Sequence, residues 1–267
     1  MTDSDPNAPY TFILKTVQSS AFRCLIEALK EILTETNIEI DEDGLKIKAM
    51  NPSRTVLVHL KLMSNKFEHF YCEKPFRMGV SMINMFKLIK MINNNDTLTL
   101  YIEKNAENQL GIKMENGEKN KMTNFKLNLI DLPNESIEID PVEFAGIITM
   151  PSTEFQNTCK IMSSISQDID IKVVNKHLIF SCEGDFASQT TEYGETNVGM
   201  SFVQNVDENE IVQGAYSLKY LLQFTKCTNL SNSIELLMKN DYPLIIRYQV
   251  AGLGQIKLCL VPEDPNN

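Results

Sequence analysis

The chain contains an internal duplication, and this feature most limits what it can fold into. Ser81–Lys90 and Ser217–Lys226 share one pattern of apolar and polar residues at an offset of 136, about half of the 267 residues. The alternating apolar residues that follow recur at the same offset: Leu98, Leu100 and Ile102 become Ile234, Leu236 and Met238. Periods of 3.6 and 2 residues are typical of helices and strands. Two echoes in register favour a duplicated chain over chance similarity.

A second pair of segments extends the repeat toward the start of each half. Phe22–Leu33 has a helical pattern followed by strand-like alternation up to Ile47, and Phe155–Met162 is followed by similar alternation up to Phe180. Between strands, Asp41–Gly44 is typical of a turn. Each half is therefore predicted to contain two helices and several antiparallel strands, which is an α+β architecture.

Composition excludes several classes of protein. The chain is 43% hydrophobic, enough for two ordinary cores, and no segment approaches the roughly 18 apolar residues of a membrane span. Met1–Pro9 is polar and acidic rather than a signal peptide. The six cysteines are scattered without metal-ligand spacing, so we expect reduced cysteines and no metal site. We also expect no cofactor, and the missing apolar span predicts no membrane partner.

The cations gather on the polar faces of the predicted helices. In Phe22–Leu33, for example, the apolar residues fill one face and leave Arg23 and Lys30 on the other. Counted over four helices, seven cations face one carboxylate, Glu27, although the whole chain has a net charge of −10. A duplicated fold would bring these faces together as one basic surface. The seven cations are Arg23, Lys30, Lys87, Lys90, Lys160, Lys219 and Lys226.

The sequence shows no motif typical of an enzyme active site. The histidines at 59, 69 and 177 are far apart, and Gly252-Leu-Gly254 lies in strand alternation without a following helix, unlike a nucleotide-binding loop. Asp168 and Asp170 alternate on a predicted strand and lack further metal ligands. We therefore expect no catalytic residues.

Several longer stretches resemble the DNA sliding clamps of the proliferating cell nuclear antigen family. They include Asp43-Gly-Leu-Lys-Ile-Lys-Ala-Met-Asn-Pro-Ser53, Met78-Gly-Val-Ser81 and Met150-Pro-Ser-Thr-Glu-Phe155. The strongest match is Asp241–Pro262, and the similarity runs from about Tyr10 to Pro262.

The resemblance implies the DNA clamp fold, in which two similar domains, each with two helices packed on antiparallel sheets, assemble into a closed ring. The implied divisions are a flexible tail at 1–9, an N-terminal domain at 10–128, an interdomain connecting loop at 129–146, a C-terminal domain at 147–262 and a tail at 263–267. Edge strands near Thr123–Leu127 and Ala187–Tyr193 would join three identical chains.

The implied function is that of a DNA polymerase processivity factor, acting in DNA replication and repair. The ring would encircle double-stranded DNA without reading its sequence, and the seven cations would lie around the DNA. Implied partners are the polymerase, other proteins with a PIP box and a clamp loader. The location would be the nucleus, or a viral or cytoplasmic replication site.

The same resemblance implies a pocket for client peptides under the connecting loop. The family positions map onto Met50, Leu57, Ile137, Ile139, Phe144, Pro243, Leu260, Val261 and Pro262. Asp140 stands where the family often has proline, and Cys259 replaces a usual aromatic residue. On the helix faces, Cys24 and Asn157 stand where the family usually has a basic residue. Two alternatives remain open from the sequence: a processivity subunit that binds DNA as a monomer, and one chain of a mixed checkpoint-type ring.

Overall fold

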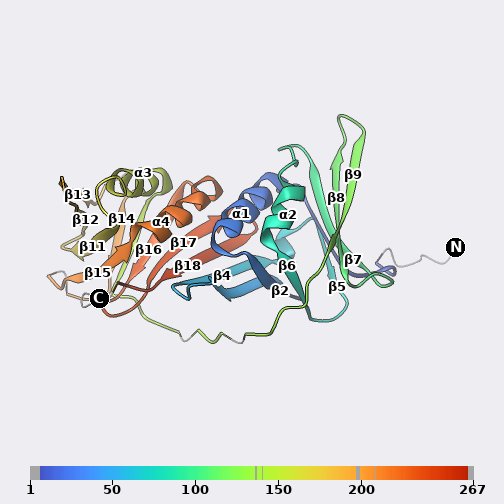
Figure 1. The fold of residues 1–267 in the computed structure, drawn as a ribbon, viewed down its shortest axis with the longest axis horizontal. Helices are drawn as coiled ribbons and strands as arrows, with labels where there is room; N and C mark the ends of the chain where they lie inside the picture. Colours follow the sequence, from blue (N-terminus) through green and yellow to red (C-terminus); the bar gives the residue numbers. More distant parts are fainter. Residues whose placement is uncertain (1–6, 136, 140, 197–198, 208, 264–267) are drawn as a thin grey trace. The chain divides into compact units, whose positions relative to one another are not determined.

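The structure, a computed structural model, describes residues 7–135, 137–139, 141–196, 199–207 and 209–263 (Figure 1). Most of the two predicted tails, and Ser136 and Asp140 of the predicted connecting loop, lie outside these residues. The chain forms two units. The first consists of Met1–Ala49, His59–Ile137 and Val250–Gln255, and the second of Met50–Val58, Glu138–Gln249 and Ile256–Asn267.

The elements of the first half follow the predicted order of helix, hairpin and strands. They are β1 (Tyr10–Thr16), α1 (Ser19–Ile32), β2 (Glu35–Asp41), β3 (Gly44–Met50), β4 (Val56–Met63), the 3-10 helix η1 (Ser64–Lys66), β5 (His69–Cys72), β6 (Phe76–Ser81), α2 (Met82–Ile89), β7 (Thr97–Glu103), β8 (Gln109–Asn116) and β9 (Lys121–Asn128).

The second half has the same order of helices and strands. Its elements are β10 (Gly146–Pro151), α3 (Ser152–Met162), β11 (Asp168–Val174), β12 (His177–Glu183), β13 (Ser188–Gly194), β14 (Ser201–Gln204), β15 (Val212–Ser217), α4 (Leu218–Phe224), the 3-10 helix η2 (Thr225–Leu230), β16 (Ser233–Met238), β17 (Leu244–Val250) and β18 (Gly254–Leu260).

Strand pairing repeats as well. The order β5-β1-β7-β8-β9 corresponds to β14-β10-β16-β17-β18, and β4-β3-β2-β6 corresponds to β13-β12-β11-β15. Pairs such as β1 with β7 and β10 with β16 are antiparallel. The predicted duplication and the α+β class are therefore confirmed, and each strand and α-helix of one half has a counterpart in the other.

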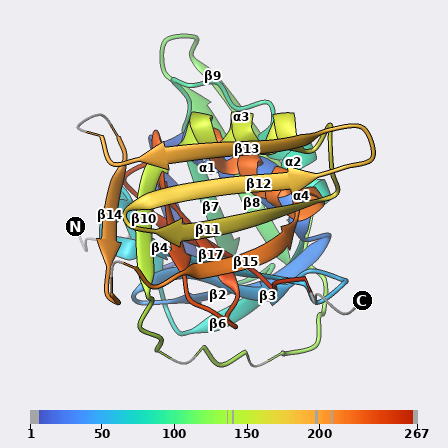
Figure 2. The same ribbon diagram turned by 90° about the vertical axis from the view of Figure 1, so that its left-hand side faces the viewer.

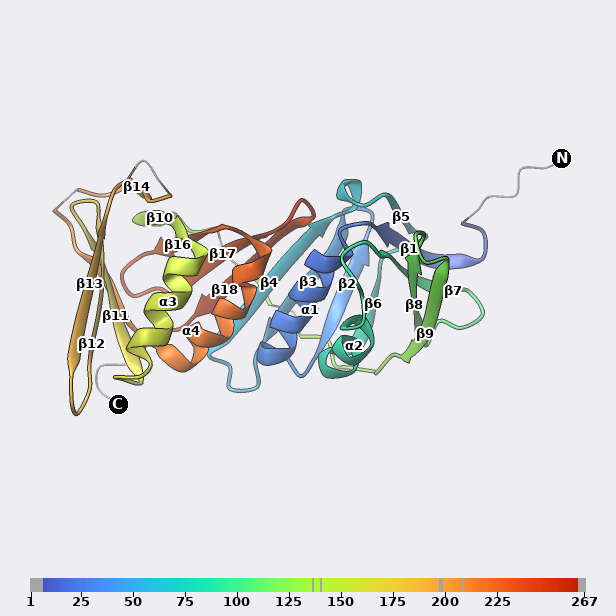
Figure 3. The ribbon, with the colours of Figure 1, turned by 90° about the horizontal axis from the view of Figure 1, so that it is seen from above.

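Two helices lie side by side in each unit, α1 with α2 and α3 with α4 (Figure 3). The period of their apolar residues explains this packing, because Met82, Met85 and Ile89 of α2 are all buried. Ser81 caps α2, its hydroxyl accepting a hydrogen bond from the backbone N–H of Asn84 at 3.4 Å. The sequence therefore placed the buried faces of the helices correctly.

The end of the last predicted helix differs from expectation. The α-helix stops at Phe224 and continues as η2, so Lys226 lies on a 3-10 helix. Thr225 contributes to this change, because its hydroxyl donates to the carbonyl oxygen of Leu222 at 2.8 Å. Gln223 of α4 is half-buried, and its side-chain oxygen is buried without a hydrogen-bond partner among the described residues.

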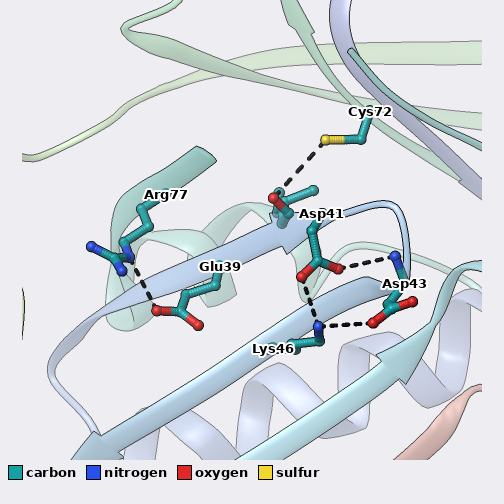
Figure 4. A network of polar contacts seen from close by, with 7 residues as sticks. Glu39, Asp41, Asp43, Lys46, Cys72 and Arg77 are labelled. Carbon is teal, nitrogen blue, oxygen red and sulfur yellow. Dashed lines mark hydrogen bonds and ion pairs between the residues drawn. The ribbon is translucent and has the colours of Figure 1, made fainter. Parts of the chain in front are cut away.

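The acidic turn between β2 and β3 is held by its own side chains (Figure 4). The Asp41 carboxylate accepts hydrogen bonds from Lys46 Nζ at 2.7 Å and from the Asp43 backbone N–H at 3.0 Å. Burial raises the pKa of Asp41, but these donors and the charge of Lys46 outweigh it and lower that pKa. Nearby, Arg77 Nε donates to Glu39 at 3.0 Å. This turn therefore uses its carboxylates for folding.

Cysteines at 159, 182 and 227 are buried, and those at 24, 72 and 259 are half-buried; within the described residues, all six are free of disulfides. Burial raises the pKa of the Cys159 thiol to about 12, which keeps it protonated and unreactive at neutral pH.

None of the described helices is both long enough and apolar enough to cross a membrane.

Candidate nucleic-acid and partner-binding surfaces

The first unit places four of the seven predicted cations on its helix pair. Lys87 and Lys90 are exposed, whereas Arg23 and Lys30 are half-buried. Arg23 Nη1 donates to the carbonyl oxygen of Ile92 at 2.7 Å, so this side chain also fixes the loop that follows α2. Lys30 Nζ lies 4.9 Å from the centre of the Phe86 ring, a cation–π contact between α1 and α2. Lys87 and Lys90 are therefore the more available charges.

The second unit contributes the other three cations. Lys160 on α3, Lys219 on α4 and Lys226 on η2 are all exposed. Lys219 Nζ lies 5.4 Å from the centre of the Tyr220 ring, at the limit of a cation–π contact. Exposed lysines with few contacts are suited to phosphate attraction without base recognition.

The predicted charge of these helices needs a correction. The sequence count set seven cations against Glu27 alone, for a net charge of +6. The described helices also contain Glu31 on α1 and Glu154 on α3, both exposed, so seven cations face three carboxylates and the net charge is +4. The helices remain basic in a chain of net charge −10, so the acidic excess lies elsewhere.

The predicted client pocket belongs almost wholly to the second unit, which contains every pocket residue except Ile137. Val261 is 43% exposed and Ile139 is 37% exposed. The half-buried members of the second unit are Met50, Leu57, Phe144, Pro243 and Pro262. Ile137, in the first unit, is half-buried on the predicted connecting loop.

Leu260 does not belong to an exposed surface. It is only 1% exposed, because alternate residues of β18 point inward and Leu260 falls on the inner side, as Leu258 and Ile256 do. Its side chain therefore packs in the core and is not available to a peptide at the surface. Val261, one residue later, has the opposite orientation.

Tyr242 is a neighbour of this surface that the sequence analysis did not select. Its ring meets the Phe144 ring edge to face, with centres 5.9 Å apart. The two aromatics are far apart in sequence, and the only hint was that Tyr242 precedes Pro243. A second contact fixes Phe144 from another side, since Asn205 Nδ2 donates to its carbonyl oxygen at 2.9 Å.

Among the strands that end a sheet within the described chain are β9 in the first unit and β13 in the second (Figure 2 shows β13 at the edge). Their counterparts, β18 and β4, are hydrogen-bonded neighbours. Two backbone hydrogen bonds flank the β4–β18 pairing, and each lies within a single unit. In the second unit, the Val261 N–H donates to the Thr55 carbonyl oxygen at 3.2 Å, and in the first unit, the Met63 N–H donates to the Leu253 carbonyl oxygen at 2.9 Å. Large exposed apolar side chains lie on β9 and close to β13, since Met122 on β9 is 59% exposed and Phe186, two residues before β13, is 76% exposed.

Comparison with known proteins gives these surfaces a context. Residues 11–136 match the proliferating cell nuclear antigen N-terminal domain, and residues 138–263 match the C-terminal domain of the same family. The chain belongs to the proliferating cell nuclear antigen family. It is also 34% identical over 255 residues to the probable DNA polymerase sliding clamp 1 of Paramecium bursaria Chlorella virus 1, covering 94% of this chain and 96% of the relative.

Membership of the proliferating cell nuclear antigen family confirms the predicted fold of two similar clamp domains and the predicted function of a DNA polymerase processivity factor, with DNA and a polymerase as partners. The alternatives of a monomeric subunit and of a mixed checkpoint-type ring are not favoured. This family acts without catalysis. In the described part of the chain, no three His, Cys, Asp or Glu side chains gather as a metal site would require.

Proposed function

We propose that three copies of this chain close into a ring that encircles duplex DNA and slides along it. The observation that carries this proposal is the repeated pairing pattern. β4 and β18 are paired within the chain, while their counterparts β13 and β9 keep a free edge. A β9 edge pairing with the β13 edge of another copy would repeat the internal arrangement and cover these two strand edges.

The side chains on the two edges support this assembly. Met122 and Phe186 would be shielded from water by the neighbouring copy, which favours association. The edges also complement each other in charge, since β9 carries Lys121 and Lys126 whereas β13 carries Glu192.

In the proposed ring, the basic helices contact the DNA. Their seven cations, on long flexible side chains, would attract the phosphates. The acidic remainder of the chain would repel DNA from other surfaces. A closed ring is retained by topology, so strong contacts are unnecessary and would hinder sliding. A clamp loader would be needed to open such a ring.

The pocket of the second unit and the connecting loop would hold the PIP-box peptides of the polymerase and of other clients. An exposed apolar surface of this kind favours a partner that covers it, and tethering raises the concentration of the client at the DNA. The relative is viral, and the proposed location is a DNA replication site, either the nucleus or a viral or cytoplasmic one.

Retention on DNA tests the ring directly. Chains loaded on a closed circular duplex should remain after a high-salt wash, and cutting the circle once should release them. Light scattering should give three times 30.4 kDa for the free protein. Equal retention on circular and cut DNA, or a concentration-independent monomer, would contradict the proposal, and a three-chain mass only after mixing with a related chain would support the mixed ring instead.

A further inference from the structure

In the first unit, an extended segment lies across the sheet. The backbone N–H of Ile130 donates to the carbonyl oxygen of Gly79 on β6 at 2.9 Å, and Asn37 on β2 donates through Nδ2 to that of Pro133 at 3.0 Å. A Cβ on Gly79 would lie 2.1 Å from the Ile130 carbonyl oxygen and 3.2 Å from Leu132 Cγ. The absence of a side chain at Gly79 therefore allows Ile130–Pro133 to cover this face of β2 and β6.

The second unit has the same strand pair. Asp170 on β11 lies opposite Ala215 on β15, as Asn37 on β2 lies opposite Gly79 on β6. The chain that leaves β18 also starts in the same way, because Glu263 N–H donates to the Ala215 carbonyl oxygen at 2.8 Å. The described residues end there, and over β11, β12 and β15 a groove of about 1000 Å³ remains among them.

The groove has a floor of strand residues and two walls. Asp170 and Lys172 of β11, Ile179 and Ser181 of β12 and Ala215 of β15 form the floor. One wall is the turn at Asp241 and Tyr242, and the other is formed by Pro262 and Glu263. Figure 2 shows β12, β11 and β15 lying side by side as one surface. These residues all belong to the second unit.

Charge distinguishes this groove from its counterpart. Three carboxylates, Asp170, Asp241 and Glu263, line it together with one cation, Lys172. None of the four makes an ion pair with another described residue. The polar Asn37 of the first unit is thus replaced by Asp170, and the groove has an excess of negative charge available to a basic ligand.

We infer that this groove binds an extended basic segment of a partner protein, held across β11 and β15 as Ile130–Pro133 is held across β2 and β6. A lysine or arginine of the partner faces the three carboxylates, and a neighbouring aliphatic or proline residue packs on Ile179 and Pro262. Pro262 also belongs to the proposed client pocket, so the two surfaces are continuous. A client can therefore occupy both, although binding to the groove does not require the pocket.

A peptide taken from the chain itself provides the probe. The labelled peptide has the sequence of residues 129–134, Leu-Ile-Asp-Leu-Pro-Asn, with the change Asp131→Lys, and the unchanged acidic peptide is its control. Fluorescence anisotropy of the full chain should show saturable binding of the basic peptide. The acidic peptide should bind roughly threefold to fivefold more weakly, in keeping with one exposed charge pair. Absence of saturable binding, or equal binding of both peptides, would overturn the inference.

Two substitutions of equal charge locate the site. Asp170→Lys should weaken binding of the basic peptide by roughly threefold to fivefold or more. Asp168→Lys, on the same strand but outside the groove lining, should have little effect. Equal weakening by both variants would indicate nonspecific attraction and overturn the inference. So would a large gain in affinity when residues 264–267 are removed, since the chain's own end would then be the occupant.

Discussion

The hydroxyl of Ser152, the first residue of α3, donates a 2.6 Å hydrogen bond to the carbonyl oxygen of Ser231, just beyond η2. Ser19, the first residue of α1, donates to the carbonyl oxygen of Asp96 at the same distance. Neither serine caps its own helix; each one ties the start of the first helix of its unit to the loop after the second. The duplication thus extends to the bonds that hold each helix pair.

Removing this bond should destabilise the fold. Ser152→Ala leaves a partly buried carbonyl oxygen without its donor and should lower the free energy of unfolding by about 1–2 kcal/mol. Thr153→Ala, an exposed position on the same turn of α3, should change it much less. Urea denaturation of the two variants measures the difference, and equal stability of both would show that the bond contributes nothing.

The hydrogen bonds to the Asp96 carboxylate should make the stability of the fold sensitive to acid. Burial raises its pKa, but the backbone and side-chain donors of Asn93, the side chain of Asn116 and the charge of Lys119 outweigh burial and lower it. The bonds from Asn93 N–H and Asn116 Nδ2 are 2.9 and 2.6 Å long. Because the folded pKa lies below the unfolded value of about 3.9, this stabilisation is complete above that value and is lost as the pH falls further.

Denaturation midpoints at a series of pH values check this expectation. The loss of stability below about pH 4 should be smaller in Asp96→Asn than in the wild type, although the variant is less stable at neutral pH. Asp168→Asn, at an exposed carboxylate on β11, is the control with the same change in charge. Parallel curves for the wild type and Asp96→Asn would exclude Asp96 as a source of the acid dependence.

Local periodicity explains what the sequence predicted well. The buried residues of α2 and the alternation in β16 depend on spacing alone, so their orientation was foreseeable. The burial of the Leu260 side chain and the partial burial of Gln223 were harder to foresee, because they depend on strand phase at the end of β18 and on the switch from α4 to η2. The groove over β11 and β15 was not foreseeable, since it depends on where the segments after β9 and β18 run.

Phe186 offers a test of the proposed ring. If the neighbouring copy covers this exposed ring, Phe186→Ser should weaken each contact by about 1–3 kcal/mol and shift the three-chain mass toward smaller species on dilution. Ile211→Ser removes another exposed apolar side chain, 43% exposed, away from both edge strands. Sedimentation at several concentrations compares them, and an unchanged assembly in Phe186→Ser would place the contact elsewhere.

The basic helices should matter for DNA but not for folding. Replacing Lys87, Lys90, Lys219 and Lys226 with alanine should leave the melting temperature and mass nearly unchanged, because exposed lysines contribute little stability. Loading onto circular DNA should fall, since four phosphate attractions per chain are lost. The control replaces four exposed lysines outside the helix pairs, at 15, 61, 66 and 74, with the same change in charge. Equal loading by both variants would remove the helices from the DNA contact.

Val261 allows the client pocket to be tested within the second unit alone. Its side chain is 43% exposed, while its backbone N–H is already bonded to Thr55, so Val261→Ser changes the surface with little effect on the strand. If a PIP-box peptide packs there, the loss of aliphatic contact should weaken binding by about 1–2 kcal/mol. Val203→Ser, at a 55% exposed position on β14 outside the predicted pocket, is the matched control. Titration of a labelled PIP-box peptide measures both. Weakening confined to Val261→Ser would support the pocket, whereas saturable binding unaffected by either substitution would place the peptide on another surface.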